Sequence, residues 1–418
     1  MKVVVLNFRC YQGPVQADHP GSCRTAPESL VAVPEPTPKA IDYYRSSNIL
    51  WAADTLLGLV IPAIFLFGGL SARLRDVALR VGRRWLPALV LYGVLFVWIS
   101  SILTLPLAYY EGFVREHAYG LSSQSFQKWA SDWVKGVAIS GIGLGLVLWI
   151  PYLLLRRSPK RWWVYTGLAT IPLATFVLVI SPVWIDPMFN RFGRMKDRVL
   201  EQRILTLAAR AGIPGSRVFE VNKSEDTKTV NAYVTGVGTT KRIVLWDTIL
   251  GKLEPDQVAF VVGHEMGHYV LHHVLAWIIM ITLFVTSALY VVHRLAHQLI
   301  MRFSDRFGFT QLSDVASFPL LMLLAGAVSL VVSPAVLAFS RHQEHEADRF
   351  GLELTRDNRA AATAFVRLQE ENLGVPRPGR LYVLLRASHP PLGDRVDFAN
   401  HYRPWECGGP LRYGRLIR

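Results

Sequence analysis

Residues 264–268 read His264-Glu265-Met266-Gly267-His268, an HExxH pattern that leads directly into a long apolar segment. On a helix, residues four apart share a face, so His264 and His268 can bind one zinc ion through their imidazole nitrogens. Glu265 is then placed to take a proton from a water bound to that ion. The alternative is a core helix with two hydrogen-bonded histidines, because five residues alone are a moderate signal. The rest of the chain decides between the two interpretations.

The composition indicates a membrane protein. Hydrophobic residues make up 51% of the 418 residues and charged residues only 18%, and the mean hydropathy is +0.27. Few soluble globular chains have such values. Six apolar stretches are long enough to cross a hydrocarbon core of about 30 Å. They are residues 49–70, 85–109, 137–155, 162–180, 276–292 and 319–339. We therefore expect a multi-pass integral membrane protein whose spans contact the lipid bilayer.

The net charge of +14 does not indicate a nucleic-acid partner, because the basic residues gather at helix ends. Arginines and lysines fill two short predicted loops between spans: Arg73, Arg75, Arg80, Arg83 and Arg84 in the first, and Arg156, Arg157, Lys160 and Arg161 in the second. Such loops usually set membrane topology and meet anionic lipid headgroups. We expect no nucleic-acid binding.

The beginning of the chain is predicted to be a polar tail. Its only early apolar run, residues 3–6, is too short for a conventional signal peptide. The three cysteines, Cys10, Cys23 and Cys407, form no CxxC pair and lie far from the HExxH in sequence. None of them is an obvious metal ligand.

The polar stretch between the fourth and fifth spans predicts a small α+β unit. Residues 200–211 have helical apolar spacing, and residues 217–221, 232–237 and 242–246 are rich in β-branched and aromatic residues typical of strands. The fold class is therefore mainly α: a polytopic membrane helix bundle with a small α+β zinc-peptidase insert and a helical C-terminal segment that completes the site. The predicted divisions are 1–45, a polar tail; 46–181, four spans; 182–275, the insert; 276–340, two spans; and 341–418, the C-terminal segment.

Two histidines leave a zinc ion short of a protein ligand, so a third must come from elsewhere. A downstream histidine of the HExxHxxGxxH type is excluded, because Leu271 and Val274 occupy the required positions. Just past the sixth span, Glu344 and Asp348 lie four residues apart, so one can bind the metal while the other supports it. Three neighbours compete on chemistry alone, and spacing does not choose among them: His342, His345 and Glu346.

HEMGH together with Glu344-His345-Glu346-Ala347-Asp348 resembles the integral-membrane zinc endopeptidases of the type I CAAX prenyl protease family. Other segments resemble that family in the same order: 115–120, 186–190, 231–233, 241–248 and 389–395. The resemblance covers residues 45 to 400 or so, with one departure. Eukaryotic members of the family have seven spans, whereas we expect six here.

The resemblance assigns roles to individual residues. It implies that Glu344 is the third ligand of one zinc ion per chain and that Asp348 supports the site from the same helix. It also implies that His389 and Arg395 donate hydrogen bonds to the oxyanion, although the residues alone indicate a proline-fixed turn and a solvated arginine. His273 matches a family histidine, but an interfacial histidine at the start of a span is the simpler interpretation. The family's membrane helices enclose a chamber, which is accordingly expected here.

Asn231, Ala232 and Tyr233 are predicted to bind substrate. An edge strand can pair with an extended peptide and present its carbonyl to the metal. An ordinary buried strand is the alternative interpretation.

Three functions fit these features. The first is a zinc endopeptidase that cleaves lipidated CAAX-type or other membrane-associated peptides, with Glu265 as general base. The second is a membrane quality-control metalloprotease of broad specificity. The third is a zinc-binding scaffold without hydrolysis, which Glu265 argues against because a structural site does not need that carboxylate. The basic loops and the family resemblance disagree on the membrane face of the catalytic insert, and that face is left undecided.

Overall fold

The computed structural model describes residues 29–236, 241–406 and 408–418. Cys10, Cys23 and Cys407 lie outside these ranges, so the statement that none of them is an obvious metal ligand is not tested. The described chain is mainly helical with one small sheet, as the sequence predicted.

Six helices in the described part of the chain are long and apolar enough to cross a membrane, which confirms the six predicted spans. At most 28% of any spanning window is buried inside the protein, so most of the apolar surface is available to lipid. The helices that carry the spans are α1 (Pro38–Phe67), α3 (Trp85–Tyr109), α5 (Phe126–Arg157), α6 (Trp162–Ile180), α10 (His273–Phe307) and α11 (Phe318–Thr355). Short elements extend or link them: η1 (Tyr110–Arg115), α4 (Glu116–Ala118), η2 (Ser181–Ile185), η3 (Asp186–Met188) and η6 (Val315–Ser317).

The arginine-rich segment after the first span is largely a helix, α2 (Leu70–Gly82), and not the short loop that we predicted. Ser71, Leu74 and Ala78 recur at helical spacing and are buried. Arg73 and Arg80 lie on the opposite face of this helix and are exposed. The segment is short and rich in arginine, so its apolar repeat is easily missed in the sequence.

The polar stretch between the fourth and fifth spans forms a compact sheet domain together with the residues that follow the sixth span. Its strands are β1 (Phe192–Arg194), β2 (Arg217–Val221), β3 (Ala232–Thr235) and β4 (Arg242–Trp246), in the order β1-β2-β4-β3. β2 and β4 are parallel, and the other two pairings are antiparallel. The helices of the domain are α7 (Arg198–Arg210), η4 (Lys223–Glu225), α8 (Asp247–Leu250), α9 (Pro255–Val270), α12 (Asn358–Glu371), α13 (Arg380–Leu385) and α14 (Leu392–His401). We predicted the last three strands, whereas β1 is too short to leave a sequence pattern.

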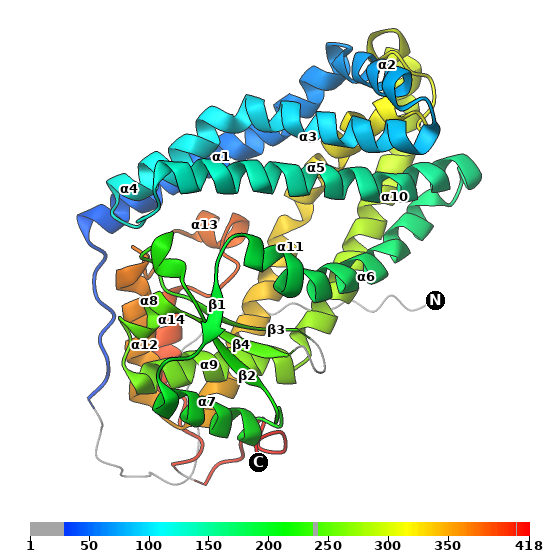
Figure 1. Cartoon of the computed structure of the whole chain (residues 1–418). Coiled ribbons are helices and arrows are strands. Elements are labelled where there is room, and N and C mark those ends of the chain that lie inside the picture. Colours follow the sequence, from blue (N-terminus) through cyan, green and yellow to red (C-terminus); the bar gives the residue numbers. More distant parts are fainter. Residues whose placement is uncertain (1–28, 237–240, 407) are drawn as a thin grey trace.

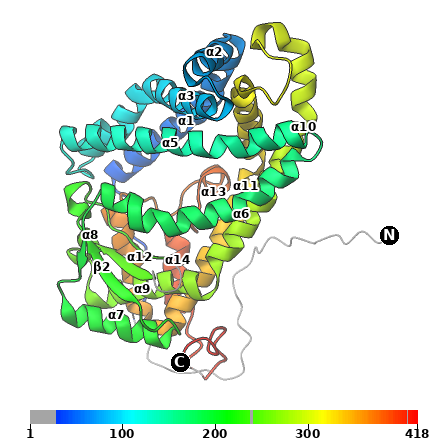
Figure 2. The ribbon, with the colours of Figure 1, turned by 45° about the vertical axis from the view of Figure 1, so that its right-hand side comes forward.

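Two hydrophobic cores hold the described part of the chain together. One joins the membrane helices around Phe65, Tyr92 and Tyr152, and the other fills the sheet domain around Phe260 and Phe365. Helices α10 and α11 run from the membrane bundle to the sheet domain, so that the far end of α11 belongs to the second core (Figures 1 and 2). A side chain on that end of α11 can therefore meet one on α9.

Candidate metal centre and active site

Helix α9 carries the HExxH and is fixed firmly at its start. Pro255 occupies the first turn, where its missing N–H is not needed, and Glu254 and Gln257 form a capping box. His264 is buried, and its neighbours on the helix, Val262 and Met266, belong to the sheet-domain core. The imidazoles therefore have few rotamers open to them, which suits a preorganised site.

Helices α9 and α11 approach each other closely because glycines line their contact. A Cβ atom on Gly267 would lie 3.2 Å from the Cα atom of Ala347, and one on Gly351 would lie 3.0 Å from the backbone nitrogen of His264. Real side chains do not tolerate such contacts without shifting their neighbours. The glycine inside the HExxH thus lets Glu344 on α11 reach the two histidines.

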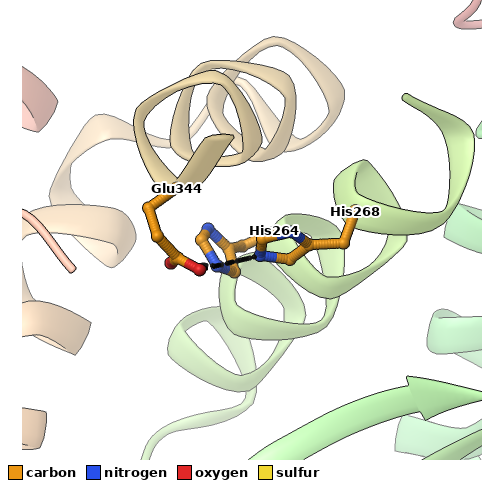
Figure 3. A group of neighbouring side chains, drawn as sticks. All are labelled: His264, His268 and Glu344. Atoms are coloured by element: carbon orange, nitrogen blue, oxygen red, sulfur yellow. Dashed lines mark hydrogen bonds and ion pairs between the residues drawn. The ribbon is translucent and has the colours of Figure 1, made fainter. Parts of the chain in front are cut away.

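Three side chains converge between the two helices (Figure 3). The Nε2 atoms of His264 and His268 lie 3.1 Å apart. The carboxylate of Glu344 places Oε2 3.3 Å from the Nε2 of His264 and Oε1 3.4 Å from the Nε2 of His268. The two imidazole nitrogens and the carboxylate thus form a compact donor triangle in which each histidine faces a different oxygen of Glu344. One ligand atom from each of the three residues can be chosen so that all three atoms lie within 4.8 Å of one another.

This triangle fits a zinc ion. Zinc binds histidine nitrogens and carboxylate oxygens at about 2.0–2.2 Å in tetrahedral geometry, which separates neighbouring donors by about 3.3–3.5 Å. Glu344 Oε2 is buried, and although the Nε2 atoms of His264 and His389 lie 3.3 and 3.4 Å away, it accepts no hydrogen bond of acceptable geometry from a described residue. A buried carboxylate oxygen without a donor is costly unless a cation balances it. Two neutral imidazoles and one carboxylate are also the donor set of catalytic zinc sites that leave a fourth position open.

The predicted supporting residues lie around the triangle. Asp348 is fully buried, and its Oδ1 lies 2.8 Å from the Nδ1 of His264. Arg395 donates from Nε and Nη2 to both oxygens of Asp348, at 2.8 and 2.6 Å, and its guanidinium packs over the ring of Phe365. Asp348 thereby orients the ring of His264, and Arg395 holds Asp348 in place.

The second histidine has a partner of its own. The Nδ1 of His268 lies 2.9 Å from the Nδ1 of His273, which is buried at the start of α10. Histidines that bind metals usually donate from their other ring nitrogen to a carboxylate, a carbonyl or water, and the Nδ1 of His273 occupies the position of such an acceptor here. The interfacial interpretation of His273 therefore has a competitor that the sequence alone could not favour.

The other possible ligands around Glu344 point elsewhere. Glu346 accepts hydrogen bonds from Arg349 and Tyr413, and the Nε2 of His345 lies 3.0 Å from the Nη2 of Arg349. His342 is exposed. Only Glu344 of these candidates joins the group that could hold a metal, although its role as a ligand stays a prediction.

Glu265 faces a cavity beside the triangle. This cavity measures 390 Å³, and its lining includes Asn231, Val261, Glu265, His389 and Arg395. Burial raises the pKa of the Glu265 carboxyl, although the two neighbouring histidines oppose the shift. A carboxylate with a raised pKa that faces a cavity suits a general base.

His389 reaches the site from the segment before α14. Its Nε2 lies 3.4 Å from Glu344 Oε2, and its Nδ1 lies 2.8 Å from the hydroxyl of Ser388. Desolvation lowers the pKa of His389, although 57% of its side chain is exposed. The tautomer in which Nδ1 accepts from the Ser388 hydroxyl carries its proton on Nε2, the nitrogen that faces Glu344.

β3 is an edge strand, and Asn231 precedes it directly. Within the described residues β3 pairs with β4 alone. The carbonyl of Asn231 accepts a hydrogen bond from the N–H of Trp246, so Tyr233 also faces β4 in the alternating antiparallel pattern. The backbone of Ala232 and Val234 then faces the free edge. The side chain of Asn231 accepts from the N–H of Ala232, whereas the N–H of Val234 has no hydrogen-bond partner among the described residues.

A membrane helix bundle joined to this histidine–histidine–glutamate site defines a membrane metalloprotease. The family model described as "Peptidase family M48" matches residues 194–403. A second model, described as "CAAX prenyl protease N-terminal, five membrane helices", matches residues 24–191. The chain belongs to peptidase family M48.

Similar proteins support this assignment over most of the chain. The "Uncharacterized metalloprotease YhfN" of Bacillus subtilis is 36% identical over 86% of this chain and 84% of its own. The "CAAX prenyl protease 1 homolog" of Dictyostelium discoideum is 28% identical over 85% and 83%, respectively. The crystal structure of S. mikatae Ste24p superimposes with a TM-score of 0.74 at 24% identity, covering 86% of this chain and 87% of that one. The last similarity shows the shared fold.

Proposed function

We propose that this protein is an endopeptidase that depends on one zinc ion per chain, held by His264, His268 and Glu344. The observation that carries the proposal is the donor triangle, because its shortest nitrogen–nitrogen and nitrogen–oxygen distances, 3.1 to 3.4 Å, are close to the separation of neighbouring donors in a zinc tetrahedron. Glu265 on the adjacent cavity favours hydrolysis over a purely structural site.

The residues divide the chemistry among them. Zinc bound here would act as a Lewis acid that polarises the scissile carbonyl and acidifies water. The Glu265 carboxylate takes the proton of the attacking water and later delivers it to the leaving amine. His389 donates from Nε2 to the developing oxyanion. Arg395 was predicted to do the same, and we retain this role for it because its side chain lines the cavity that Glu265 faces and its Nη2 lies 4.0 Å from Glu344 Oε2.

The substrate is held as an added strand. The free edge of β3 presents the carbonyl of Ala232 and the N–H of Val234 beside the cavity that Asn231 and Glu265 line. The inner wall of this cavity is apolar and includes Phe260, Val261 and Leu392. It suits an aliphatic side chain next to the scissile bond.

We further propose that the substrates are membrane-associated peptides cut near the C-terminus, lipidated CAAX-type peptides among them. Several similar proteins are named CAAX prenyl proteases, and membrane helices adjoin the site. A lipid attached to the substrate would pack against the apolar surface of the membrane helices.

One experiment tests both levels of this proposal. A peptide ending in CAAX is incubated with and without a farnesyl group on its cysteine, using the purified full-length protein and Glu265→Gln. We expect cleavage of the farnesylated form by the wild-type protein, loss of that cleavage with a chelator, and restoration by zinc. Glu265→Gln should keep the metal and lose at least about 10³-fold in kcat.

The alternatives give different results. Equal cleavage of both peptides would favour a quality-control protease of broad specificity. A protein that binds zinc and cleaves neither these peptides nor unfolded membrane proteins would contradict the peptidase proposal.

A further inference from the structure

A second cavity adjoins the proposed active site and is not used by the mechanism above. It measures 720 Å³, and Pro390 and Arg395 line both cavities, so the two are direct neighbours. Its wall is built from the start of the helical turn that carries Glu344, from α13 and from the proline turn before α14.

The wall of this second cavity is strongly cationic. The charged or titratable lining residues are Arg341, His345, Arg377, Arg380, Asp394 and Arg395. A cavity with an excess of guanidinium groups attracts an anion.

Some of these charges are already matched inside the protein. Arg377 pairs with Asp394 at 3.1 Å and with Asp397 at 2.6 Å, and Arg395 pairs with Asp348. Neither Arg377 nor Arg395 is therefore the main binding group for an added anion.

Two arginines keep free donors. Arg341 donates from Nη1 to the carbonyls of Val383 and Ala387, both at 2.8 Å, while its Nε and Nη2 meet no acceptor in the described part of the chain. Arg380 is exposed, and within the described residues it has neither an ion pair nor a hydrogen bond. Arg341 and Arg380 thus line the same cavity with guanidinium groups that pair with no carboxylate of the described residues.

The position of this pair suits one particular anion. Arg341 precedes Glu344 by one helical turn, so the two side chains are close neighbours on α11. A peptide cut near its C-terminus carries a free carboxylate a few residues beyond the scissile bond, and three extended residues span about 10 Å. A carboxylate also matches the fork of a guanidinium in a bidentate pair.

We propose that Arg380 and Arg341 bind the C-terminal carboxylate of the substrate and so set how far from the C-terminus the chain is cut. This inference rests on the proposed peptidase function and adds a specificity site to it. A long protein chain that passes through the site without ending there would lack this contact.

The test compares two peptides that are identical except for a C-terminal carboxylate or a C-terminal amide. We expect the full-length zinc-loaded protein to cleave the acid with a kcat/KM at least about tenfold higher than the amide. Arg380→Gln should reduce this ratio to near one, and Arg380→Lys should restore part of it. Arg80→Gln removes the same charge at the far end of the membrane bundle and should keep the wild-type ratio.

A binding measurement makes the test independent of turnover. In Glu265→Gln protein, the acid should bind about tenfold more tightly than the amide, and the difference should disappear when Arg380→Gln is added. Equal affinities of the two peptides would overturn the carboxylate site, even where both are cleaved and the peptidase function stands. Binding of inorganic phosphate that depends on Arg380, together with equal peptide affinities, would also overturn it and identify a phosphate site instead.

Discussion

Asp348 contacts both a proposed metal ligand and a buried cation, although it lies outside the donor triangle. Its carboxylate bonds the Nδ1 of His264 on one side and the guanidinium of Arg395 on the other. We predict that Asp348→Asn weakens zinc binding by about 10- to 100-fold, because the ring of His264 loses its orientation and basicity. Zinc affinity measured by competition with a chelator checks this. Unchanged affinity would show that Asp348 only stabilises the fold.

His273 and His272 are adjacent in sequence but differ in their contacts, which makes them a matched pair. His273 is buried against His268, whereas His272 is exposed and has a left-handed backbone with φ of 55°. We predict that His273→Asn lowers zinc affinity by about tenfold or more. His272→Asn should leave zinc affinity unchanged, because asparagine tolerates the left-handed backbone at position 272. Metal content after dialysis distinguishes them. Equal effects of the two substitutions would assign His273 to the membrane interface.

The sequence predicted the site unevenly at this scale. His264, Glu265 and His268 were accessible because one helical turn relates them. The choice of Glu344 over Glu346 was not accessible from spacing, because it depends on how α11 is rotated against α9. The glycine contacts at Gly267 and Gly351 fix that rotation, and they exist only in three dimensions.

Strand β3 offers its free edge through alternate residues, and this gives a prediction about the element. Proline at position 234 removes the outward N–H and leaves the β4 pairing of Tyr233 intact. We predict that Val234→Pro lowers kcat/KM by about tenfold or more with little change in metal content, whereas Val234→Ala, which keeps the N–H, has a much smaller effect. Steady-state kinetics on one peptide checks this. Equal kinetics for the two variants would contradict substrate pairing along β3.

Asp226 connects the sheet domain to the beginning of α5 and predicts a pH dependence. Burial alone would raise the pKa of its carboxyl, but hydrogen bonds from Asn190 and Lys128 outweigh burial and lower it. A lowered pKa in the folded state stabilises the protein above the unfolded value of about 3.9, and this stability is lost as the pH falls through the folded pKa.

The corresponding variant is Asp226→Asn. We predict a loss of about 1 kcal/mol at pH 7, after allowance for solvent screening, and no difference from the wild type at pH values below the folded pKa. Thermal unfolding in detergent across this pH range measures both. A constant difference at every pH would show that charge is not the cause.

At the scale of elements, apolar length was easier to predict than helix ends. The six spans follow directly from hydropathy, whereas α10 and α11 continue through polar residues far beyond their apolar parts. The continuation of α11 is what brings Glu344 to α9, and packing in the sheet-domain core supports it. Local composition contains no information on such packing.

The whole molecule has two ends of different character. The sheet domain with the proposed active site occupies one end, and the described basic segments, α2 and the α5–α6 connection, lie at the other (Figure 1). A cavity lined by Arg75, Trp85, Arg156 and Asp314 shows that α2, the end of α5 and the α10–α11 connection meet there. Because the six spans run between them, the sheet domain and the end that carries α2 face opposite sides of the bilayer.

This arrangement predicts the labelling of single cysteines in sealed vesicles. The three native cysteines are replaced by serine, and Arg80→Cys on α2 or Thr206→Cys on α7 is introduced, both at exposed positions. An impermeant maleimide added from outside should label one variant and spare the other until the vesicles are opened, because a charged reagent does not cross the hydrocarbon core. Labelling of both variants from the same side would contradict the six-span arrangement.

Vesicles of known orientation then show which membrane face carries the proposed active site. The positive-inside rule places Arg80 on the cytoplasmic side. If Thr206 is exposed on that side instead, the basic residues near the sheet domain outweigh the arginines of α2 in setting the topology.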